Sequence, residues 1–517
     1  MSSTQDRPTV LIAGAGPTGL VLALSLARRG IPVRLIDQAE AAGDQSRAMA
    51  VQARTLEFYQ QFGFADEVIA SGVKMERVHL REGGDSSSKG FEVLSVTFRD
   101  LGKGLSPYPF ALAFPQDDHQ RLLVAKLQDA GVEVEWGTKL TDFDQDGASI
   151  TARLEHGDNR TEQVRAEYLC GCDGAHSTVR ETLKLGFVGG TYPQLYYVAD
   201  VQIEGGFERD LFLNLGVKTL AILLPVRSRG VQRLIGLVPS EVDTGADLSF
   251  EELRPHVEPL IGKRVTQVNW FATYRVHHRV ADHFQVGRAF ICGDAGHVHS
   301  PVGGQGMNTG IGDAINLGWK LAMVARRRAA PTLLESYEAE RIPFARTLVA
   351  TTDRAFTQFV SGGLKGEAIR RFFIPLVFTL GTKFELGRHA LFGMVSQIRI
   401  SYEHGPLAFG KAGHVEGGER LPWIASDGID NFAPLVSLDW QGHVYGDASS
   451  DLIAACEQLH LPVHIMTWSE RAHEAGLEKD AFCLVRPDGY IAVATSGTVA
   501  ASALEKYVTE RGLRFSN

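Results

Sequence analysis

Apolar and polar positions near the N-terminus follow one another in a pattern that predicts a strand, a helix and a second strand. Residues 9–13 form an apolar, β-branched run that is typical of a buried parallel strand. Residues 18–29 carry apolar side chains at helical spacing, and Gly30 is placed to end that helix. Residues 33–37 indicate a second strand that ends in Asp37. Such a unit predicts an α/β domain built on a Rossmann-like parallel sheet.

A second strand-to-helix segment occurs near the middle of the N-terminal half. Residues 167–180 predict a strand, a turn at Asp173 and a helix that Ser177 can cap. Arg180 falls in the first turn of this helix. We therefore expect Asp173 and Arg180 to form a buried pair that holds the turn rigid.

A third segment of the same kind ends in a glycine-rich loop. Residues 288–297 predict a strand with Asp294 at its end, and the loop at 301–308 leads into a helix at 309–326. A helix N-terminus presents free N–H groups and the positive end of the helix dipole. The loop is therefore where we expect developing negative charge to be stabilised.

The rest of the chain predicts a sheet, a helical stretch and a mixed tail. Apolar runs between residues 196 and 280, such as 197–203 and 220–226, favour a mostly antiparallel sheet that covers the site. Residues 346–410 have a helical, aromatic-rich pattern. The tail predicts strands around 434–438, 463–468 and 482–485 and helices near 451–458 and 500–511.

These patterns divide the chain into four predicted parts. We expect a discontinuous domain at 1–185 and 280–345, an inserted β-sheet domain at 186–279, a helical bridge at 346–410 and a tail domain at 411–517. The polar stretch at 82–89 is the best candidate for a mobile loop.

Composition narrows the class of protein. The 517 residues are 44% hydrophobic and 22% charged, which is typical of a globular chain of several domains. The net charge of −9 and the lack of a basic tail argue against nucleic acid or an anionic membrane as a partner. The uncharged stretch 10–27 nearly reaches the length of a membrane span, but its three glycines and one proline favour a buried strand and helix. Five thinly spread cysteines without a C-x-x-C pair favour a reduced, cytoplasmic setting.

The glycines of the first segment have the spacing of a phosphate cradle. Gly14 would permit the tight turn, Gly16 would let a pyrophosphate approach the backbone, and Gly19 would let helix and strand pack closely. Asp37 can accept hydrogen bonds from a ribose diol. This motif alone does not distinguish NAD from FAD.

Taken together and in this order, the three segments resemble those of the FAD-dependent aromatic hydroxylases. These are single-component flavoprotein monooxygenases of the para-hydroxybenzoate hydroxylase and phenol hydroxylase type. The tail resembles the thioredoxin-like C-terminal domain of the phenol hydroxylase branch, although it has no C-x-x-C pair. A structural or dimer-stabilising role is therefore expected for the tail.

The resemblance implies an FAD site built from all three segments. Arg47 would reach the pyrophosphate, with Arg54 as the alternative. Gln116, in a loop before a helix expected at 120–127, would lie along the isoalloxazine ring. Asp294 would bond the ribityl chain. The residues implied at FAD are Gly14, Gly16, Pro17, Thr18, Gly19, Asp37, Arg47, Gln116, Asp173, Gly174, Arg180, Gly293, Asp294, Pro301, Gly303, Gly304, Gly306, Met307 and Asn308.

The resemblance also implies a reaction. NAD(P)H would bind transiently and reduce FAD, since no second G-x-G-x-x-G follows a strand. O2 would add at flavin C4a, and the hydroperoxide would transfer OH to a small aromatic substrate that is phenolic or polycyclic. A phenol would also need a base to share its proton, for which we consider Tyr274, Arg275, His277 and His278.

Other interpretations remain open at this point. The same cofactor chemistry could insert oxygen next to a ketone in a Baeyer–Villiger reaction. The chain could also bind FAD or a ligand without turnover. His297 and His299 have an H-x-H spacing, but a third ligand is not evident and no metal is expected.

Overall fold

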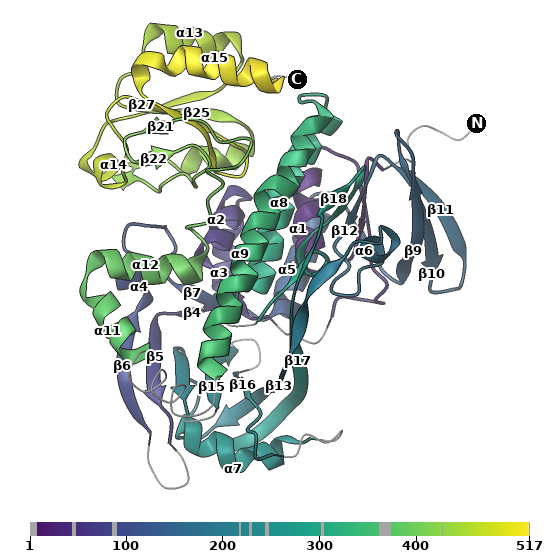
Figure 1. The fold of residues 1–517 in the computed structure, drawn as a ribbon, viewed down its shortest axis with the longest axis vertical. Helices are drawn as coiled ribbons and strands as arrows, with labels where there is room; N and C mark the ends of the chain where they lie inside the picture. The colour runs from purple at the N-terminus through teal and green to yellow at the C-terminus, as the bar shows by residue number, and fades with distance from the viewer. Residues whose placement is uncertain are drawn as a thin grey trace.

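A six-stranded sheet forms the base of the N-terminal domain (Figure 1). The computed structural model of the chain describes residues 8–43, 48–84, 90–216, 219–226, 230–242, 248–300, 304–360, 374–426 and 428–515. The strand order is β18 (Gln285–Val286), β19 (Ala289–Ile291), β12 (Tyr168–Gly171), β1 (Val10–Ala13), β2 (Val33–Ile36) and β8 (Val134–Glu135). All neighbours are parallel except β18 and β19. The predicted Rossmann-like strand–helix–strand unit is confirmed.

Two helices pack closely beside this sheet. They are α1 (Pro17–Ala27) and α8 (Gly306–Ala325), and glycines of α8 make the close approach possible. A Cβ on Gly310 would overlap the hydroxyl of Thr18, and a Cβ on Gly318 would overlap the hydroxyl of Ser25. The start of α8 thus lies beside the start of α1, and both N-termini lie at the same end of the sheet.

The second large sheet of the molecule has eight strands (Figure 1). Its order is β20 (His297–Val298), β17 (Val265–Ala281), β13 (Phe187–Ile203), β16 (Val231–Leu237), β15 (Leu220–Val226), β14 (Leu211–Leu215), β5 (Arg77–Glu82) and β6 (Phe91–Thr97). All neighbours are antiparallel except β14 and β5. The expected antiparallel sheet is present, and it also takes in strands from outside the predicted interval 186–279.

The two faces of this sheet pack against different parts of the molecule. Tyr197 and Ala199 on β13 face α7 (Phe250–Ile261), with which they share a buried cluster. Tyr196, one residue earlier, belongs to a separate aromatic cluster on the opposite face. Because side chains alternate along a strand, one face is closed by α7 and the other is turned toward the N-terminal domain.

Smaller elements complete the first 400 residues. Two three-stranded sheets contain β9 (Thr138–Gln145), β10 (Ile150–His156) and β11 (Thr161–Ala166), and β3 (Ala50–Val51), β7 (Ala111–Ala113) and β4 (Val73–Met75). The remaining helices are α2 (Ala53–Gln61), α3 (Ala65–Ser71), α4 (Phe98–Leu101), α5 (Gln116–Asp129), α6 (Thr178–Thr182), α9 (Glu335–Val360), α11 (Ile374–Lys383) and α12 (Glu385–Ser396).

The tail is a separate α/β unit, drawn in yellow-green in Figure 1. Its four-stranded sheet has the order β26 (Val463–Met466), β25 (Gln441–Tyr445), β27 (Ala481–Val485) and β28 (Ile491–Thr495). Its helices are α13 (Ser450–Gln458), α14 (Glu470–Glu474) and α15 (Ala500–Arg511), and two short hairpins pair β21 (Lys411–Ala412) with β22 (Val415–Glu416) and β23 (Ala425–Ser426) with β24 (Ile429–Asp430). This is the expected thioredoxin-like arrangement, with both of its cysteines free and buried.

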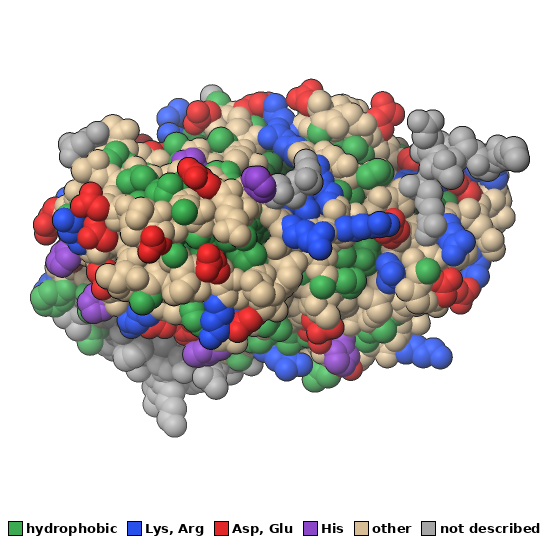
Figure 2. Space-filling model, turned by 90° about the horizontal axis from the view of Figure 1, so that it is seen from above, with side chains coloured by type: hydrophobic (Ala, Val, Ile, Leu, Met, Phe, Trp, Pro, Cys, Tyr) green, Lys and Arg blue, Asp and Glu red, His purple; other side chains and the backbone are tan. Residues whose placement is uncertain are grey.

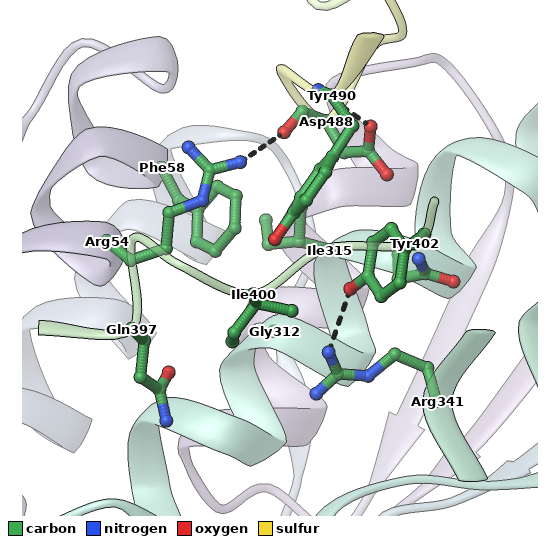
Figure 3. A pocket seen from close by; sticks show the side chains of 11 residues that line it. Arg54, Phe58, Gly312, Ile315, Arg341, Gln397, Ile400, Tyr402, Asp488 and Tyr490 are labelled. Atoms are coloured by element: carbon green, nitrogen blue, oxygen red, sulfur yellow. Dashed lines mark hydrogen bonds between the residues drawn. The ribbon is translucent and has the colours of Figure 1, made fainter. Parts of the chain in front are cut away.

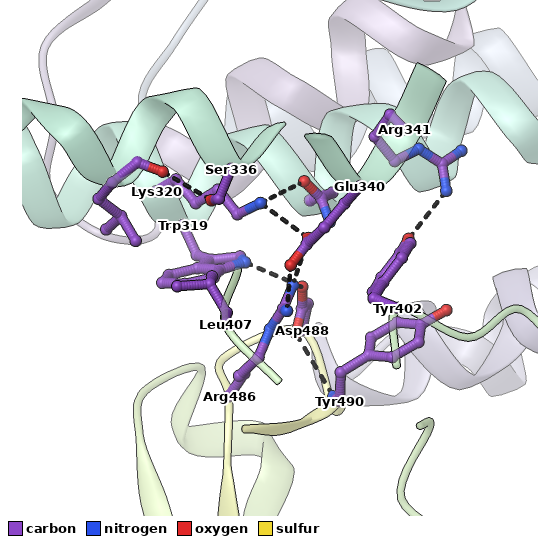
Figure 4. A network of polar contacts seen from close by, with 12 residues as sticks. Trp319, Lys320, Ser336, Glu340, Arg341, Tyr402, Leu407, Arg486, Asp488 and Tyr490 are labelled. Atoms are coloured by element: carbon purple, nitrogen blue, oxygen red, sulfur yellow. Dashed lines mark hydrogen bonds and ion pairs between the residues drawn. The ribbon is translucent and has the colours of Figure 1, made fainter. Parts of the chain in front are cut away.

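A network of buried charges holds the tail against α8 and α9 (Figure 4). The carboxylate of Glu340 accepts hydrogen bonds from Lys320 at 2.8 Å and from Arg486 at 2.7 and 3.0 Å. Asp488 pairs with Arg486 at 2.6 Å and accepts a bond from the indole of Trp319 at 2.9 Å. The tail is therefore bonded into the core of the molecule rather than carried on a linker.

Two sequence predictions differ from the structure. The predicted strand 434–438 is a 3₁₀ helix, Ala433–Ser437, because Pro434 lies in its first turn and Leu438 follows it with a φ of 55°. Gln116 begins α5 and does not lie in a loop before it. Of the loop predicted at 82–89, residues 85–89 lie outside the described part of the chain.

The molecular surface seen from above carries mixed charge (Figure 2). Lys and Arg side chains form a short row across the middle of this face, with acidic side chains at its sides. None of the helices in the described ranges has the length and apolar character needed to cross a lipid bilayer.

Candidate active site

The first glycine segment forms the turn between β1 and α1, and unfilled space borders this turn at Gly16. Gly14 has a φ of 103°, and a Cβ there would overlap the carbonyl oxygen of Cys172. A Cβ on Gly19 would overlap the carbonyl oxygen of Gly14. A Cβ on Gly16, in contrast, would have no atom of the described residues within 4 Å. Gly14 and Gly19 are therefore required by packing, whereas Gly16 borders the space where a ligand would lie.

The helix behind this turn has an open N-terminus. Gly16 is the N-cap of α1 and Pro17 occupies its first turn, which contains no acidic residue. A helix start leaves backbone N–H groups without intrahelical partners, and these bind anions readily. The residues present therefore fit a pyrophosphate.

Asp37 lies beside the same turn at the end of β2. Its carboxylate accepts hydrogen bonds from the backbone N–H of Ala15 at 2.6 Å and of Ala39 at 2.8 Å. The side chain is half-buried, so one side of it stays accessible. Asp37 thus stabilises the glycine turn through hydrogen bonds and lies at the position predicted for the ribose.

A glutamine that the sequence analysis did not single out also touches the cradle. Gln120 on α5 donates to the carbonyl of Ala15 at 2.7 Å and accepts from the N–H of Gly43 at 3.2 Å. The predicted Gln116, one turn earlier, accepts from the N–H of Ala48 at 3.1 Å. Only the helical spacing of four residues between the two side chains could have indicated Gln120.

The two arginines proposed for the pyrophosphate have different outcomes. Arg47 lies outside the described residues. Arg54 is buried, donating to Glu57 and to the carbonyl of Asp488 in the tail, both at 2.8 Å. Arg54 therefore binds the tail, and it is removed as the alternative to Arg47.

The second segment has the predicted turn but not the predicted ion pair. Gly174 has a φ of 78°, and the Ser177 hydroxyl caps α6 by accepting from the N–H of Arg180. Arg180 does not pair with Asp173. Its guanidinium donates instead to the carbonyl oxygens of Ala175 at 2.8 Å and Ala295 at 3.1 Å. The expected Asp–Arg pair was wrong, because Arg180 is used to tie the second segment to the third.

Asp173 keeps one oxygen available. Its Oδ2 accepts from the N–H of Val179 at 3.3 Å, whereas its buried Oδ1 has no partner among the described groups. Burial raises the pKa of this carboxyl. An unsatisfied buried oxygen beside an open cradle fits a ligand that supplies the missing hydrogen bond.

Asp313 of α8 holds the third segment in place through hydrogen bonds. This buried carboxylate accepts from the N–H of Gly293 at 3.0 Å and from Arg341 at 2.5 Å, and it bonds His297 at 2.7 Å. Burial opposes its ionisation, but Arg341 and His297 hold the pKa of Asp313 at about 2. His297 therefore serves this network. An acidic residue within an otherwise apolar helix was the signal that could have identified Asp313.

Asp294, which directly follows Gly293, lies in a short 3₁₀ turn and is exposed. Gly293 has a φ of 62°, and a Cβ there would lie 2.8 Å from the hydroxyl of Thr18. The turn thus brings Asp294 close to the first segment. This is the position from which its carboxylate could bond a ligand held by the cradle.

The glycine-rich loop is tied down by the side chain of Asn308. The amide donates to the carbonyls of Ala50 and Gly304, both at 2.8 Å. Its oxygen accepts from the N–H of Gln52 at 3.0 Å and from the hydroxyl of Thr55 at 2.8 Å. Asn308 therefore shapes the loop through protein contacts. The predicted Pro301 and Gly303 lie outside the described residues.

The first turn of α8 follows directly. Gly306 begins this helix and is followed by the half-buried Met307 and the buried Asn308, and the turn contains no acidic residue. No side-chain cap to its N–H groups is found within the described ranges. These N–H groups fit the anionic part of a flavin ring, because a helix N-terminus stabilises negative charge.

The four candidate bases on β17 divide between the two faces of the sheet. Tyr274 stacks on Tyr196 with ring centroids 5.5 Å apart, and His278 packs on Tyr192 at 4.6 Å. Strand β20, which leads into the glycine-rich loop, pairs with β17 beside His278, with Val298 opposite Arg279. Ser300 lies close enough to the Tyr196 hydroxyl to affect its pKa. Tyr274 and His278 thus share the face that meets the third segment.

Arg275 and His277 alternate with them and are exposed. Arg275 donates to the carbonyl of Pro193 at 2.8 Å, and His277 bonds the hydroxyl of Thr191 at 2.7 Å. Partial desolvation and the nearby charge of Arg279 lower the pKa of the His277 side chain. The structure does not bring these two residues to the face that meets the third segment.

A small cavity lies where α2, α8 and the tail meet (Figure 3). Its volume is about 10 Å³, and it is lined by residues that include Arg54, Ile315, Tyr402 and Tyr490. This is room for about one water molecule. The cavity therefore cannot be the substrate site.

Comparison with known proteins agrees with this geometry. A family model described as "FAD binding domain" matches residues 7–352, which is more than half of the chain. The chain is 36% identical over 424 residues to 6-methylpretetramide 4-monooxygenase of Streptomyces rimosus, covering 79% of this chain and 72% of the relative. It is 31% identical over 366 residues to pentachlorophenol 4-monooxygenase of Sphingobium chlorophenolicum, covering 69% and 66%.

Among solved structures, anhydrotetracycline hydroxylase OxyS from Streptomyces rimosus matches with a TM-score of 0.76 and 26% identity, over 99% of both chains. The match thus extends through the tail as well as the FAD-binding part. The chain belongs to the FAD-dependent aromatic hydroxylases, a family of single-component flavoprotein monooxygenases.

Proposed function

We propose that this FAD-dependent monooxygenase hydroxylates a phenolic ring of a polycyclic aromatic substrate, with NAD(P)H as a transient electron donor. The relatives are named for 6-methylpretetramide, pentachlorophenol and anhydrotetracycline. The observation within this chain that carries the proposal is the aromatic face of the eight-stranded sheet. It lies next to the third segment, where the flavin ring is expected.

The aromatic face suits a planar, apolar molecule. Tyr196 and Tyr274 stack with an interplanar angle of 26°, and Leu220, Leu237 and Ile222 pack around them. Aromatic rings prefer offset-stacked or edge-to-face contacts, which extended fused rings can make with several side chains at once. A substrate of several rings would use this face more fully than a single phenol would.

The residues of the site divide the binding of FAD between them. The first turn of α1 would bind the pyrophosphate, Asp37 the ribose and Asp294 the ribityl chain. The first turn of α8 would hold the ring on the side that carries negative charge on reduction. Bound FAD supplies the electron transfer and oxygen activation.

Two side chains on the aromatic face are suited to handle the substrate proton. Burial raises the pKa of Tyr196, so its hydroxyl stays protonated and can donate. His278 has a buried Nδ1 with no partner within the described chain. We propose that His278, helped by Tyr274, is the better of the predicted bases, whereas Arg275 and His277 would act only at the surface.

The sequence left two alternatives to hydroxylation, which are FAD binding without turnover and Baeyer–Villiger insertion. FAD binding without turnover is not supported, because the chain belongs to a family of monooxygenases. Baeyer–Villiger insertion remains the second candidate, because the same cofactor could act on a ketone held on the same face. Product chemistry distinguishes it from hydroxylation.

The test is a screen of phenolic polycyclic compounds, single-ring phenols and matched ketones. NADH and NADPH consumption is measured with and without each compound, and products are analysed by mass and by alkaline hydrolysis. We expect stimulation by phenolic polycycles and a product that is 16 mass units heavier and stable to base. A base-labile ester would favour Baeyer–Villiger insertion, and stimulation by single-ring phenols alone would contradict the proposed substrate class.

Two further properties remain proposals. All five cysteines are free and buried, which supports the reduced, cytoplasmic setting expected from the sequence. A homodimer also remains a proposal, and sedimentation of the purified protein tests it.

A further inference from the structure

We infer that Gln397, at the end of α12, is a positioning residue that fixes the first turn of α8 against the flavin. The inference rests on the proposed placement of the flavin ring at this turn. It assigns to the helical bridge a part in setting the electrostatics of the cofactor, although that bridge is about 90 residues away from the turn in sequence.

The contacts of Gln397 span the first turn of the helix. Its amide nitrogen donates to the side-chain oxygen of Gln305 at 2.7 Å and to the hydroxyl of Thr309 at 2.9 Å. Gln305 is the N-cap of α8, and Thr309 lies one turn further along. The Thr309 hydroxyl itself donates to the carbonyl of Gln305 at 2.9 Å. One amide from another helix thus holds both ends of the turn.

The backbone of Gln397 is in a conformation that favours glycine. Its φ is 61° and its ψ is 9°, in the left-handed region, and the residue is only 6% exposed. A glycine would occupy this position at the end of α12 without steric cost. A long side chain held in such a conformation and buried is a feature that points to a role for that side chain.

The turn is held from a second direction by Asn308, whose amide bonds Ala50 and Gly304. Figure 3 shows Gln397 reaching toward α8 from the chain segment that passes Ile400. Asn308 fixes the loop before the helix, whereas Gln397 fixes the helix itself. The amides of Asn308 and Gln397 donate to side-chain oxygens and backbone carbonyls. Because these bonds do not use the backbone N–H groups at the start of α8, those groups stay available to the cofactor.

The position of these N–H groups decides how well they stabilise charge. Preorganised donors are effective only when they already point to the place where charge develops. A displacement of about 1 Å can cost on the order of 10²-fold in rate. Loss of the Gln397 amide would let the turn relax, so that negative charge beside it is stabilised less well.

The test compares two variants with a matched control. Gln397→Gly removes the amide and relieves the left-handed backbone, so the fold should be kept. Gln397→Asn keeps an amide but shortens its reach. The control is His460→Gly in the tail, an exposed residue with a φ of 53° that undergoes the same backbone change. Each protein is prepared as the full-length holoenzyme.

Four readouts are needed, and each can be measured without an aromatic substrate. They are the melting temperature, the dissociation constant of FAD, the midpoint reduction potential of bound FAD and the rate of its reduction by NAD(P)H. We expect Gln397→Gly to keep the wild-type melting temperature but to shift the potential to a more negative value. Reduction by NAD(P)H should slow by about tenfold to a hundredfold. Gln397→Asn should change in the same direction, and His460→Gly should match the wild type.

A wild-type potential and reduction rate in a stable, flavin-loaded Gln397→Gly would overturn the inference. A fall in melting temperature and flavin content together would also overturn it, because Gln397 would then be only a structural residue. The measurements stay valid if the proposed substrate class is wrong, so the two proposals fail separately.

Discussion

Arg486 of the tail and Glu340 of α9 form a two-pronged ion pair, with N–O distances of 2.7 and 3.0 Å and neither side chain exposed. The pair joins residues 146 positions apart in sequence. Glu340 also bonds Lys320, and Arg486 also bonds Asp488, so each charge in the group has an opposite partner. The tail therefore completes the charge balance of the FAD domain core.

Removing one partner should be costly. Arg486→Met would leave Glu340 and Asp488 with less compensation in a buried site. Breaking a buried pair in this way costs about 3–5 kcal/mol of unfolding free energy. Lys506→Met, in the exposed pair of Lys506 with Glu510, is the control and should cost at most about 1 kcal/mol. Urea unfolding of both variants checks the difference, and equal losses would contradict the structural role given to Arg486.

The same carboxylate predicts a dependence of stability on pH. Burial opposes the ionisation of Glu340, but Arg486 and Lys320 hold its pKa at about 2. The pKa of a glutamate in an unfolded chain is about 4.3. The stabilisation of the folded protein by ionised Glu340 is therefore complete above that pH and is lost as the pH falls toward 2. Glu340→Gln should be less stable than the wild type at neutral pH, and the gap should close between about pH 4 and pH 2. A gap that stays constant over this range would show that Glu340 is not ionised in the folded protein.

The local elements could be predicted from the sequence, whereas most side-chain partners could not. The predicted strand 220–226 and helix 500–511 have the bounds found in the structure. These elements have period-two or period-3.6 patterns that nearby residues set. Arg54, in contrast, binds a carbonyl 434 positions away, and no local pattern records that choice.

The candidate site shows the same limit. The glycines could be assigned because turns and close approaches need them at fixed spacing, as Gly14 and Gly19 show. Arg180 was placed beside Asp173 because the two are close in sequence, but it bonds Ala295, 115 positions away. Which acceptor an arginine reaches depends on how the segments pack.

Gly16 provides a direct test of the cradle. Gly16→Val would place a side chain in the open space before α1, where the pyrophosphate is expected, so FAD binding should be lost while the fold is kept. Gly147→Val is the matched control, because a Cβ there also meets no described atom within 4 Å. Flavin content and melting temperature are measured for both. Stoichiometric FAD in a folded Gly16→Val would show that the cradle is misplaced.

Asp294 should contribute to FAD affinity rather than to folding, because it is exposed at the end of a strand. Loss of a hydrogen bond to a charged group costs about 1.5–3 kcal/mol, so Asp294→Ala should raise the dissociation constant of FAD by about ten- to a hundredfold. Asp129→Ala, an exposed residue at the end of α5, serves as the control. Fluorescence titration with FAD checks this, and an unchanged dissociation constant would remove Asp294 from the site.

The two glycines at the start of α8 should respond differently to the same substitution. Gly304 has a φ of 61°, and a Cβ there would lie 2.9 Å from the Cβ of Ala50. Gly304→Ala should therefore lose about 1 kcal/mol or more of stability together with flavin. A Cβ on Gly306 would meet only the His299 ring, at 3.9 Å among the described atoms. Alanine is also the better helix former there, so Gly306→Ala should stay folded and keep FAD.

What Gly306→Ala changes is the surface that faces the ring. The added methyl group stands at the helix N-terminus where N–H groups would stabilise charge, so substrate-stimulated NAD(P)H oxidation should slow or be diverted to H2O2. A displaced donor at such a site can cost on the order of 10²-fold in rate. The measurements are flavin content, melting temperature and the ratio of product to NAD(P)H consumed. Wild-type rate and coupling in a stable Gly306→Ala would mean that this turn does not tune the flavin, and that its glycines serve only the backbone.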